Sequence, residues 1–344
     1  MSEQQLDVLG IGEPMALFEV AHDGPLDRSS RFRLRMAGAE ANLLIGVARL
    51  GHRPGLLSAV GADPFGALIL RTLRDEGVDV AEVAEDPERP TGVFFKQVTG
   101  REQRRVFYYR DGSAASAVNL SSIQALERQR PRLVVVSGLT LGLGGPGGMG
   151  DTAQACLRRA RELGIATVFD ANLRSGLWEG ETAAAEFAEL RGCLDLVLAG
   201  REELEVLVQG HDAVHAARRL RSMDGCAGVI VKDGPEGSIV IDREGVAHIP
   251  ALPVARVVDP VGAGDAFGAG VVAGWLRGWS LREAARLGSV LGGAVVARRG
   301  DWEGVPHESE ARRLLAELPA IEVAKPVPGA RTMLTAPTHG DLDA

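Results

Sequence analysis

The chain has 344 residues, of which 45% are hydrophobic, 24% are charged and only 4% are aromatic, and its formal net charge is −8. This composition can bury a sizeable core, so it excludes disorder for most of the chain, and the length fits either two domains or one large α/β unit. The negative charge argues against a nucleic-acid-binding or anionic-membrane protein, because no basic field exists to neutralise phosphates.

The cysteines and the termini indicate where the protein resides. Cys156, Cys193 and Cys226 form no Cys-x-x-Cys pair, and we interpret them as small hydrophobic residues in a reducing compartment rather than as zinc or redox ligands. The first residues lack the basic start and the apolar stretch of a signal peptide, and no uncharged apolar run approaches the roughly 20 residues of a membrane helix. The sequence therefore predicts a soluble, cytoplasmic protein.

Apolar runs of strand length alternate with longer segments of helical periodicity. The predicted strands are Leu6–Ile11, Leu133–Val136, Ala166–Phe169, Leu194–Leu198, Gly228–Val231 and Ser238–Ile241. The predicted helices are Asn42–Leu50, Phe65–Glu76, Thr152–Leu163, Ala213–Met223 and Ala263–Arg277. Asp63 before Pro64 is typical of a helix N-cap, and Gly77 is a stop for the same helix. This alternation predicts a parallel sheet that is covered on both faces and binds ligands at the carboxyl ends of its strands.

Two segments, about 15–35 and 91–110, break this alternation, because they lack a helical period and are rich in strand-forming residues. One interpretation is a small sheet that pairs across the sequence and forms a lid or a dimer face; the other is a set of ordinary surface hairpins. After about Glu322 the chain becomes rich in proline and polar residues. We therefore expect one domain over residues 1–320 and a flexible tail over residues 321–344.

The strongest indication of a functional site is the segment Asp259–Gly270, with the sequence DPVGAGDAFGAG. Because the next helix begins at Ala263, Gly262 and Gly264 lie at a helix N-terminus. Backbone N–H groups and the helix dipole favour an anion there, and small residues let a phosphate approach closely. Asp265 would repel that anion, but it is useful if it accepts a proton from a hydroxyl that attacks the phosphate. The alternative is an ordinary acidic residue in a first helical turn.

Motifs for other chemistries are incomplete. No lysine follows a glycine, as a Walker A loop requires, and no Gly-x-Ser-x-Gly segment is present. The segment Gly10–Met15 begins like a dinucleotide-binding loop but contains Pro14 and lacks the third glycine. His211 and His215 are one helical turn apart without an evident third ligand, so we interpret them as a solvated helix face.

The segment Asp259–Gly270 resembles the C-terminal signature of the PfkB (ribokinase-like) carbohydrate kinases. Met36–Asn42, followed by Ile45–Gly51, resembles their N-terminal signature, although Ala37 replaces the first glycine of the usual pair. The resemblance extends over about residues 8–306, with the motifs in the family's order. It implies an α/β fold of the ribokinase-like type, a three-layer α/β/α sandwich with a mostly parallel central sheet, and it turns the two unusual segments into a small β-sheet lid.

Within the family, Phe107–Ser116, Phe169–Trp178 and Arg299–Pro306 resemble segments of 2-keto-3-deoxygluconate kinases, although Phe94 stands where those kinases often have tyrosine. The residues that the resemblance implies for substrate binding are Gly38 and Asn42 as the floor of the sugar site, Tyr108 and Arg110 as its cover from the lid, and Arg174 near the substrate or the transferring phosphate.

An aromatic hydroxyl beside a guanidinium suits a polyol that carries a carboxylate. The alternatives are that Arg110 is a lid-edge charge facing solvent and that Arg174 forms a salt bridge within a loop.

The resemblance also implies ATP and Mg²⁺. The residues expected to contact ATP are Asn172, Lys232, Gly234, Gly237, Gly262 and Gly264. Asp170 and Asn172 would face phosphates and Mg²⁺ through water, and Glu203 would help hold Mg²⁺, although Gly200 stands where the family's motif has asparagine. Asp259 can serve a monovalent-cation site, such as one for K⁺. The alternative for the segment 231–237 is a simple hairpin turn.

The sequence thus predicts an ATP-dependent kinase that converts 2-keto-3-deoxygluconate to its 6-phosphate. Asp265 would be the general base, and the backbone amides of Gly262, Ala263 and Gly264 would stabilise the transferring group. We also expect a homo-oligomer that forms through the lid. The alternatives are a PfkB kinase for a neutral sugar of the fructose or ribose type, a non-catalytic nucleotide-binding sensor and, more remotely, a nicotinamide-dependent oxidoreductase.

Overall fold

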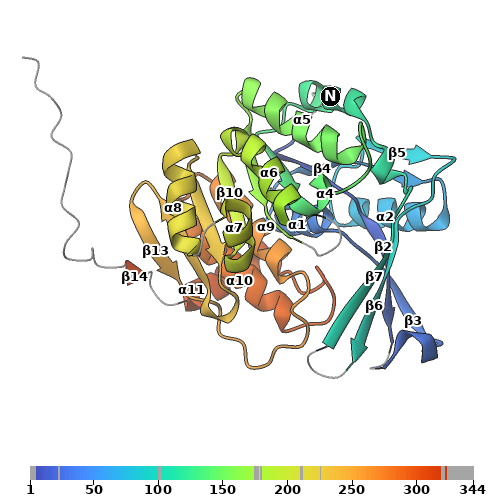
Figure 1. Ribbon diagram of the computed structural model, residues 1–344. Coiled ribbons are helices and arrows are strands. Elements are labelled where there is room, and N and C mark those ends of the chain that lie inside the picture. Colours follow the sequence, from blue (N-terminus) through green and yellow to red (C-terminus); the bar gives the residue numbers. More distant parts are fainter. Residues whose placement is uncertain are drawn as a thin grey trace, which may run out of the picture.

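Figure 1 shows the computed structural model of the chain, which describes residues 5–21, 24–99, 103–173, 178, 180–209, 212–224, 226–318 and 322–323. A large sheet with helices on both faces forms the body, and a smaller sheet extends from one side of it. The predicted three-layer α/β/α sandwich with a separate small sheet is therefore confirmed.

The large sheet has ten strands in the order β14-β13-β12-β11-β10-β9-β8-β1-β4-β5. Their bounds are β1 (Val8–Ile11), β4 (Pro54–Gly61), β5 (Val83–Asp86), β8 (Leu133–Ser137), β9 (Ala166–Asp170), β10 (Leu196–Gly200), β11 (Gly228–Lys232), β12 (Ser238–Asp242), β13 (Gly245–Ile249) and β14 (Glu322–Val323). Neighbouring strands from β5 to β11 are parallel, whereas β12, β13 and β14 are added antiparallel. The parallel strands β9, β10 and β11 therefore end at one edge of the sheet, in Asp170, Gly200 and Lys232.

Alternate residues of each central strand enter separate cores on the two faces of the sheet, as in β8, where Val134 and Val136 face one core and Leu133 and Val135 the other. The first core is covered by α5 (Met149–Glu162), α6 (Gly180–Leu190), α7 (Arg201–Val208) and α8 (Ala213–Asp224). The second is covered by α1 (Ala39–Arg49), α2 (Pro64–Asp75), α9 (Ala263–Leu276), α10 (Leu281–Val296) and α11 (Glu308–Glu317). Shorter elements are α3 (Gln124–Gln129), α4 (Gly138–Leu141), η1 (Leu26–Arg28), η2 (Ala115–Ala117), η3 (Leu120–Ile123), η4 (Arg191–Cys193) and η5 (Gly234–Glu236).

Helix α9 lies unusually close to both of its neighbours. A Cβ added at Gly270 would lie 2.6 Å from the backbone nitrogen of Gly288 in α10, and one added at Gly46 in α1 would lie 2.5 Å from the Cβ of Ala269. Such distances admit only glycine unless a backbone moves. The small residues of α9 therefore fix its axis between α1 and α10, and with it the position of its N-terminus.

The small sheet has the order β3-β2-β6-β7, with β2 (Met15–Val20), β3 (Phe32–Ala37), β6 (Val93–Thr99) and β7 (Gln103–Tyr109). It joins the two segments that break the helix–strand alternation, and we call it the lid. The pairing of Leu17 with Phe94, and of Phe94 with Tyr108, places these side chains on one face, which packs toward the body. Phe95 points to the opposite face, where its ring stacks on Phe18 at 5.0 Å between centroids.

Local signals at the helix ends behave as predicted. The Asp63 carboxylate accepts hydrogen bonds from the backbone N–H groups of Phe65 and Gly66 at the start of α2, and Gly77 follows its end with φ +81°.

Cys156 and Cys226 are buried, Cys193 is half-buried, and all three are thiols rather than members of a disulfide. Burial raises the pKa of Cys156 to about 12, so that this thiol stays protonated at neutral pH and behaves as an apolar side chain.

None of the helices in the described part of the chain combines the length and the apolar character needed to cross a bilayer. The predicted tail over residues 321–344 lies outside the described residues, except for Glu322 and Val323, which form β14.

Candidate active site

The turn that leads into α9 forms the centre of the site. Gly262 is the N-cap residue and has φ +81°, a conformation that favours glycine. A Cβ at this position would lie only 1.8 Å from the carbonyl oxygen of Asp301, so the neighbouring loop also excludes any side chain. Ala263 and Gly264 open the helix, where the first N–H groups have no partners within the helix itself. The Ala263 N–H donates a hydrogen bond of 3.3 Å to the carbonyl oxygen of Pro260. The turn nevertheless directs its backbone N–H groups to one helix N-terminus, as an anion site requires.

Asp265, in the first turn of α9, is half-buried and is held by Asn42 from α1. The Asn42 Nδ2 donates a hydrogen bond of 2.8 Å to the Asp265 Oδ2, and the Asn42 Oδ1 accepts one of 3.4 Å from the backbone N–H of Gly38. Gly38 is itself pressed against the β1–β2 connection, because a Cβ there would lie 2.6 Å from the Glu13 carbonyl oxygen. The structure thus brings together Gly38, Asn42 and Asp265.

Lys232 at the end of β11 approaches the same turn from the sheet. Its Nζ lies 2.6 Å from the Asp170 Oδ1 and 3.6 Å from the point where a Cβ of Gly264 would stand. Burial opposes a charge on Lys232, but Asp170 and Glu203 hold the pKa of its ammonium above the ordinary value. Burial raises the pKa of Asp170, with Lys232 opposing that rise and Glu203 adding to it. One ammonium therefore serves two acidic side chains at the sheet edge.

The loops around this ammonium carry the other residues expected on the nucleotide side. Glu203 accepts hydrogen bonds from the backbone N–H groups of Gly200 and Leu173, at 2.6 and 3.0 Å, so it closes the start of α7 and orients the loop after β9. Asn172 in that loop has φ +37°, a conformation uncommon outside glycine, and its side chain is buried. Gly234 and Gly237 shape the turn between β11 and β12, with φ +54° and +98°. This turn is a hairpin, and it also stands at the edge where Lys232 lies.

The lid places Tyr108 and Arg110 next to one another, with the Arg110 guanidinium 5.9 Å from the centroid of the Tyr108 ring. Arg110 is only 6% exposed, which excludes the interpretation of a lid-edge charge facing solvent. Its Nε lies 2.6 Å from the Oε2 of Glu13, and burial raises the pKa of Glu13 although Arg110 and Ser113 oppose that rise. The arginine is therefore one half of a buried ion pair, a partner that the sequence did not reveal.

Arg174, the remaining residue expected near the substrate, lies outside the described residues.

Lys96 of β6 is a site residue that the sequence motifs missed. It is completely buried, and its Nζ lies 2.7 Å from the Oδ2 of Asp259 and 2.9 Å from the Oδ1 of Asp301. Asp259, which the sequence predicts as a ligand of a monovalent cation, therefore has a lysine ammonium against its carboxylate. The composition offered one indication of this residue. The chain has only three lysines, at positions 96, 232 and 325, and two of them lie at this site.

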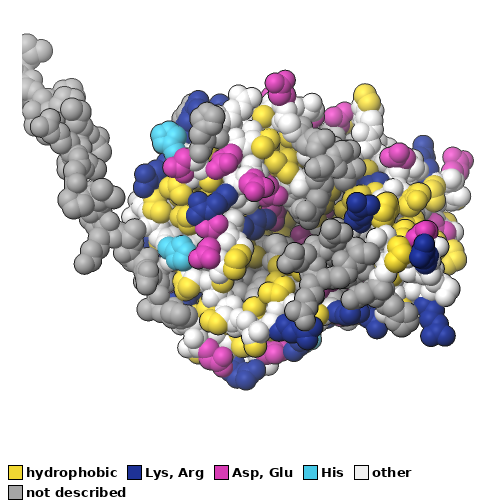
Figure 2. Space-filling model, turned by 60° about the horizontal axis from the view of Figure 1, so that its bottom comes forward, with side chains coloured by type: hydrophobic (Ala, Val, Ile, Leu, Met, Phe, Trp, Pro, Cys, Tyr) yellow, Lys and Arg dark blue, Asp and Glu magenta, His cyan; other side chains and the backbone are white. Residues whose placement is uncertain are grey.

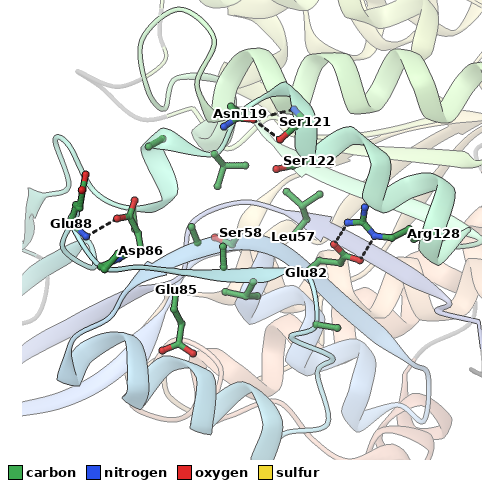
Figure 3. Close-up of a pocket in the computed structure, with 18 residues that line it drawn as sticks. Leu57, Ser58, Glu82, Glu85, Asp86, Glu88, Asn119, Ser121, Ser122 and Arg128 are labelled. Atoms are coloured by element: carbon green, nitrogen blue, oxygen red, sulfur yellow. Dashed lines mark hydrogen bonds and ion pairs between the residues drawn. The ribbon is translucent and has the colours of Figure 1, made fainter.

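A separate hollow of about 590 Å³ lies between the β4–β5 edge and the segment around η3. Figure 3 shows it lined by Ser58, Glu82, Asp86 and Arg128, with Arg128 bonded to Glu82. It shares no lining residue with the turn before α9. This hollow is thus separate from the site described above.

Comparison with known proteins identifies the family. The model described as pfkB family carbohydrate kinase matches residues 5–308. The chain belongs to this family and is a carbohydrate kinase. Two similar proteins are both named 2-dehydro-3-deoxygluconokinase: that of Thermoproteus tenax is 34% identical over 92% of this chain and 96% of its own length, and that of Bacillus subtilis (strain 168) is 33% identical over 91% and 96%.

Solved structures agree with the fold of the kinase. The PfkB protein from Polaromonas sp. JS666 has a TM-score of 0.80 and 32% identity, covering 89% of this chain and 99% of its own. The sugar kinase PH1459 from Pyrococcus horikoshii, solved in complex with ATP, has a TM-score of 0.74 and 26% identity, covering 89% and 99%. The ribokinase-like fold that the sequence motifs imply is therefore confirmed.

The buried Arg110–Glu13 pair gives the kinase a testable pH dependence. Replacing Arg110 by methionine leaves the Glu13 carboxylate without its cation, so its folded-state pKa rises further above that of the unfolded chain. A carboxyl pKa that is higher in the folded state lowers the free energy of unfolding as the pH rises above the ordinary value of 4.5. At low pH, where Glu13 is protonated in both states, the raised pKa has no effect on stability. We expect Arg110→Met to lose about 3–5 kcal/mol of unfolding free energy near pH 7, and clearly less near pH 5.

Urea unfolding at the two pH values measures this difference. Arg105→Met is the matched control, because Arg105 is an exposed arginine of β7, the strand that directly precedes Arg110. An equal loss for Arg110→Met at both pH values would show that Glu13 is not the partner that matters.

Proposed function

We propose that the protein transfers the γ-phosphate of ATP to a hydroxyl of a sugar acid, and that 2-keto-3-deoxygluconate is the acceptor, phosphorylated at its 6-hydroxyl. The observation that carries the proposal is the position of Asp265, hydrogen-bonded to Asn42 and set in the first turn of α9, directly after the glycine-rich turn. The names of the relatives at 34% and 33% identity support the choice of acceptor. Similar proteins at 27% identity, named 5-dehydro-2-deoxygluconokinase, act by name on a related acid sugar.

In this proposal Asp265 accepts the proton of the attacking hydroxyl as the new bond to phosphorus forms and the bond to the ADP oxygen breaks. A carboxylate beside a phosphate is otherwise unfavourable, so a proton-accepting role explains why an acid stands there. Asn42 donates to one carboxylate oxygen and so fixes the direction of the other. The backbone N–H groups of Gly262, Ala263 and Gly264 stabilise the negative charge on the transferring group.

ATP is proposed to lie along the edge where β9, β10 and β11 end, with Lys232 and the turn of Gly234 and Gly237 beside it. The complex of PH1459 with ATP supports the choice of nucleotide. Lys232 lies between Asp170 and the start of α9, which is a suitable position for a cation that must meet phosphate oxygens. Asn172 contributes its side chain from the strained loop after β9.

Mg²⁺ fits the donors on this side. Glu203 is close enough to Asp170 to add to the raised pKa of that carboxyl, and oxygen ligands of this kind suit a hard cation bound mainly by nucleotide phosphates and water. Mg²⁺ would neutralise phosphate charge during transfer. Within the described residues, no three or more acidic, histidine or cysteine side chains form a metal cluster.

The lid is proposed to close over the sugar. Tyr108 offers a hydroxyl, and Arg110 offers the guanidinium N–H groups other than the Nε that faces Glu13. A guanidinium can hold a carboxylate by two parallel hydrogen bonds, and this would set an acid sugar apart from a neutral one.

A panel of acceptors tests the proposal. With ATP and Mg²⁺, we expect ADP release with 2-keto-3-deoxygluconate at a kcat/KM at least about 10²-fold above that with fructose or ribose, because an unpaired buried guanidinium penalises an acceptor without a carboxylate. The galacto epimer is the control for stereochemistry, and chelation of Mg²⁺ should stop the reaction. A preference for fructose or ribose would establish the neutral-sugar alternative, and nucleotide binding without turnover of any acceptor would establish the sensor.

Asp265→Asn separates catalysis from binding. The amide keeps the size of the side chain but cannot accept the proton, so we expect kcat to fall by about 10²–10⁴-fold. The Kd for ATP, measured by calorimetry, should stay within about threefold, since the backbone of the turn before α9 is unchanged. Glu181→Gln, which removes another acid from the first turn of a helix, is the control and should leave kcat unchanged. A fully active Asp265→Asn protein would contradict the general-base role.

We further propose that two copies of the chain associate through the outer face of the lid. Exposed apolar side chains gather there, with Phe32, Leu34, Phe107 and Tyr109 between 37% and 63% exposed. Figure 2 shows apolar side chains collected on the side of the molecule where Figure 1 places the lid strands. Such a patch on a soluble domain is typical of an interaction surface, and a second copy offers a matching apolar face.

Light scattering after gel filtration tests this association. Leu34→Asp with Tyr109→Asp should convert the dimer to a monomer, because both charges would enter the apolar contact. Leu120→Asp is the matched control, since Leu120 is 50% exposed and lies on η3, outside the lid. A wild-type protein that is monomeric, or a variant that remains dimeric, would rule out the lid as the contact.

A further inference from the structure

The ion-paired cluster of Lys96, Asp259 and Asp301 (the Lys96 triad) is buried more completely than the catalytic centre. Lysine is almost never fully buried unless it is paired, and Lys96 is 0% exposed. Burial opposes the charge, but Asp301 and Asp259 hold the pKa of the Lys96 ammonium above its ordinary value. Burial also raises the pKa of Asp301, with Lys96 opposing that rise. The two carboxylates therefore stabilise the charged form of Lys96, and Lys96 in turn stabilises the charged form of Asp301.

Both carboxylates of the triad belong to segments that shape the turn before α9. The Asp259 Oδ1 accepts a hydrogen bond of 3.2 Å from the backbone N–H of Val261, one residue before Gly262. The backbone of Asp301 contacts Gly262 directly, since its carbonyl oxygen occupies the space of a Cβ there. The Lys96 Nζ lies between the two side chains and so joins both supports of the turn.

Lys96 is the main positive charge of the triad and its surroundings. In register, Lys96 stands beside Glu19 of β2, which is 3% exposed. Arg35 of β3 lies 3.9 Å from Glu19 and forms an ion pair with Glu303, and Glu303 adds to the raised pKa of Asp301. Removal of the Lys96 charge would therefore leave an excess of carboxylates next to the turn.

A free K⁺ ion does not fit this arrangement. An ammonium and K⁺ carry the same charge, are similar in size and both bind oxygen atoms. Here the ammonium is already at hydrogen-bond distance from an oxygen of each carboxylate, at 2.7 and 2.9 Å. Asp259 is therefore engaged by a cation that the chain itself supplies.

We propose that Lys96 is a positioning residue whose ammonium acts as a built-in monovalent cation, holding Asp259 and Asp301, and through them the Gly262 turn, in the conformation that phosphoryl transfer requires. Two consequences follow. The enzyme needs no free monovalent cation, and the lid strand β6 takes part directly in ordering the turn. The kinetic part of the inference rests on the proposed kinase function, whereas cation binding can be measured without it.

Two variants of the same position test the proposal. Lys96→Ala leaves room for a small cation between the carboxylates, whereas Lys96→Met fills most of that space with an uncharged chain. Activity and melting temperature are measured at constant ionic strength in K⁺, NH₄⁺ or methylammonium, with tetramethylammonium as the cation too large to enter. The wild-type protein is measured in the same series, so the test does not depend on how well the variants fold.

We expect the wild-type kcat and Tm to be the same in all four cations. Lys96→Ala should lose about 10²-fold in kcat in tetramethylammonium, because a misplaced turn misaligns the reacting groups, and should recover at least about tenfold in K⁺, NH₄⁺ or methylammonium. Its Tm should rise by at least about 2 °C with the same small cations, because they bind only the folded state. Lys96→Met should be as slow as Lys96→Ala and should respond to none of them.

Contrary outcomes are equally clear. Activation of the wild-type protein by K⁺ would overturn the inference, as would full activity of Lys96→Met or a Lys96→Ala protein that small cations neither activate nor stabilise. If no sugar acid is phosphorylated, the proposed function fails, but the Tm series still decides whether Lys96 occupies a cation position.

Discussion

The close packing of α9 between α1 and α10 is the constraint on which the rest of the site depends. Gly270 and Gly46 allow contacts that any larger residue would prevent, and these contacts leave α9 one position along and around its axis. Because Asn42 is on α1 and Asp265 on α9, the same packing sets the 2.8 Å hydrogen bond between them. The geometry of the proposed catalytic site is thus a consequence of how closely these backbones approach, and side chains at the site refine it rather than create it.

Charge balance is the second organising feature. Acidic side chains outnumber basic ones around the turn, yet the proposed substrates are anions. Two ammonium groups resolve this conflict in different ways: Lys232 stands at the sheet edge between Asp170 and the helix N-terminus, where a phosphate can share it, whereas Lys96 is completely enclosed by Asp259 and Asp301. A charged side chain that binds a ligand must be accessible to that ligand. A charged side chain that only holds a loop in place interacts more strongly with its partners where water is excluded.

Much of the fold could be predicted from the sequence because its signals are local. The predicted strands over residues 133–136, 166–169 and 228–231 and the helix from Ala263 carry their own periodicity, and each is present. Strand β4, with its leading proline and two glycines, escaped notice because tertiary packing, rather than pattern, makes it a strand. Helix α10 was also missed, although Ser280 and Glu283 form a capping box at its start that the sequence could have revealed. At the site, glycine spacing revealed the turn before α9. The partners Glu13 and Lys96 are separated from Arg110 and Asp259 by 97 and 163 residues, and no local pattern encodes such pairs.

The lid illustrates how one strand can serve several purposes at once. Side chains of β6 alternate between its faces, so Phe94 and Lys96 point toward the body while Phe95 joins the outer apolar face. A shift of one residue in the pairing of β6 would expose the ammonium, bury Phe95 against carboxylates and leave Asp259 and Asp301 without their cation. The buried ion pairs therefore fix the register of the lid more strictly than its apolar contacts do, because an apolar side chain can find another partner, whereas a buried carboxylate cannot. The contact that we propose to order the turn before α9 would thus also define the sheet that is proposed to close over the sugar.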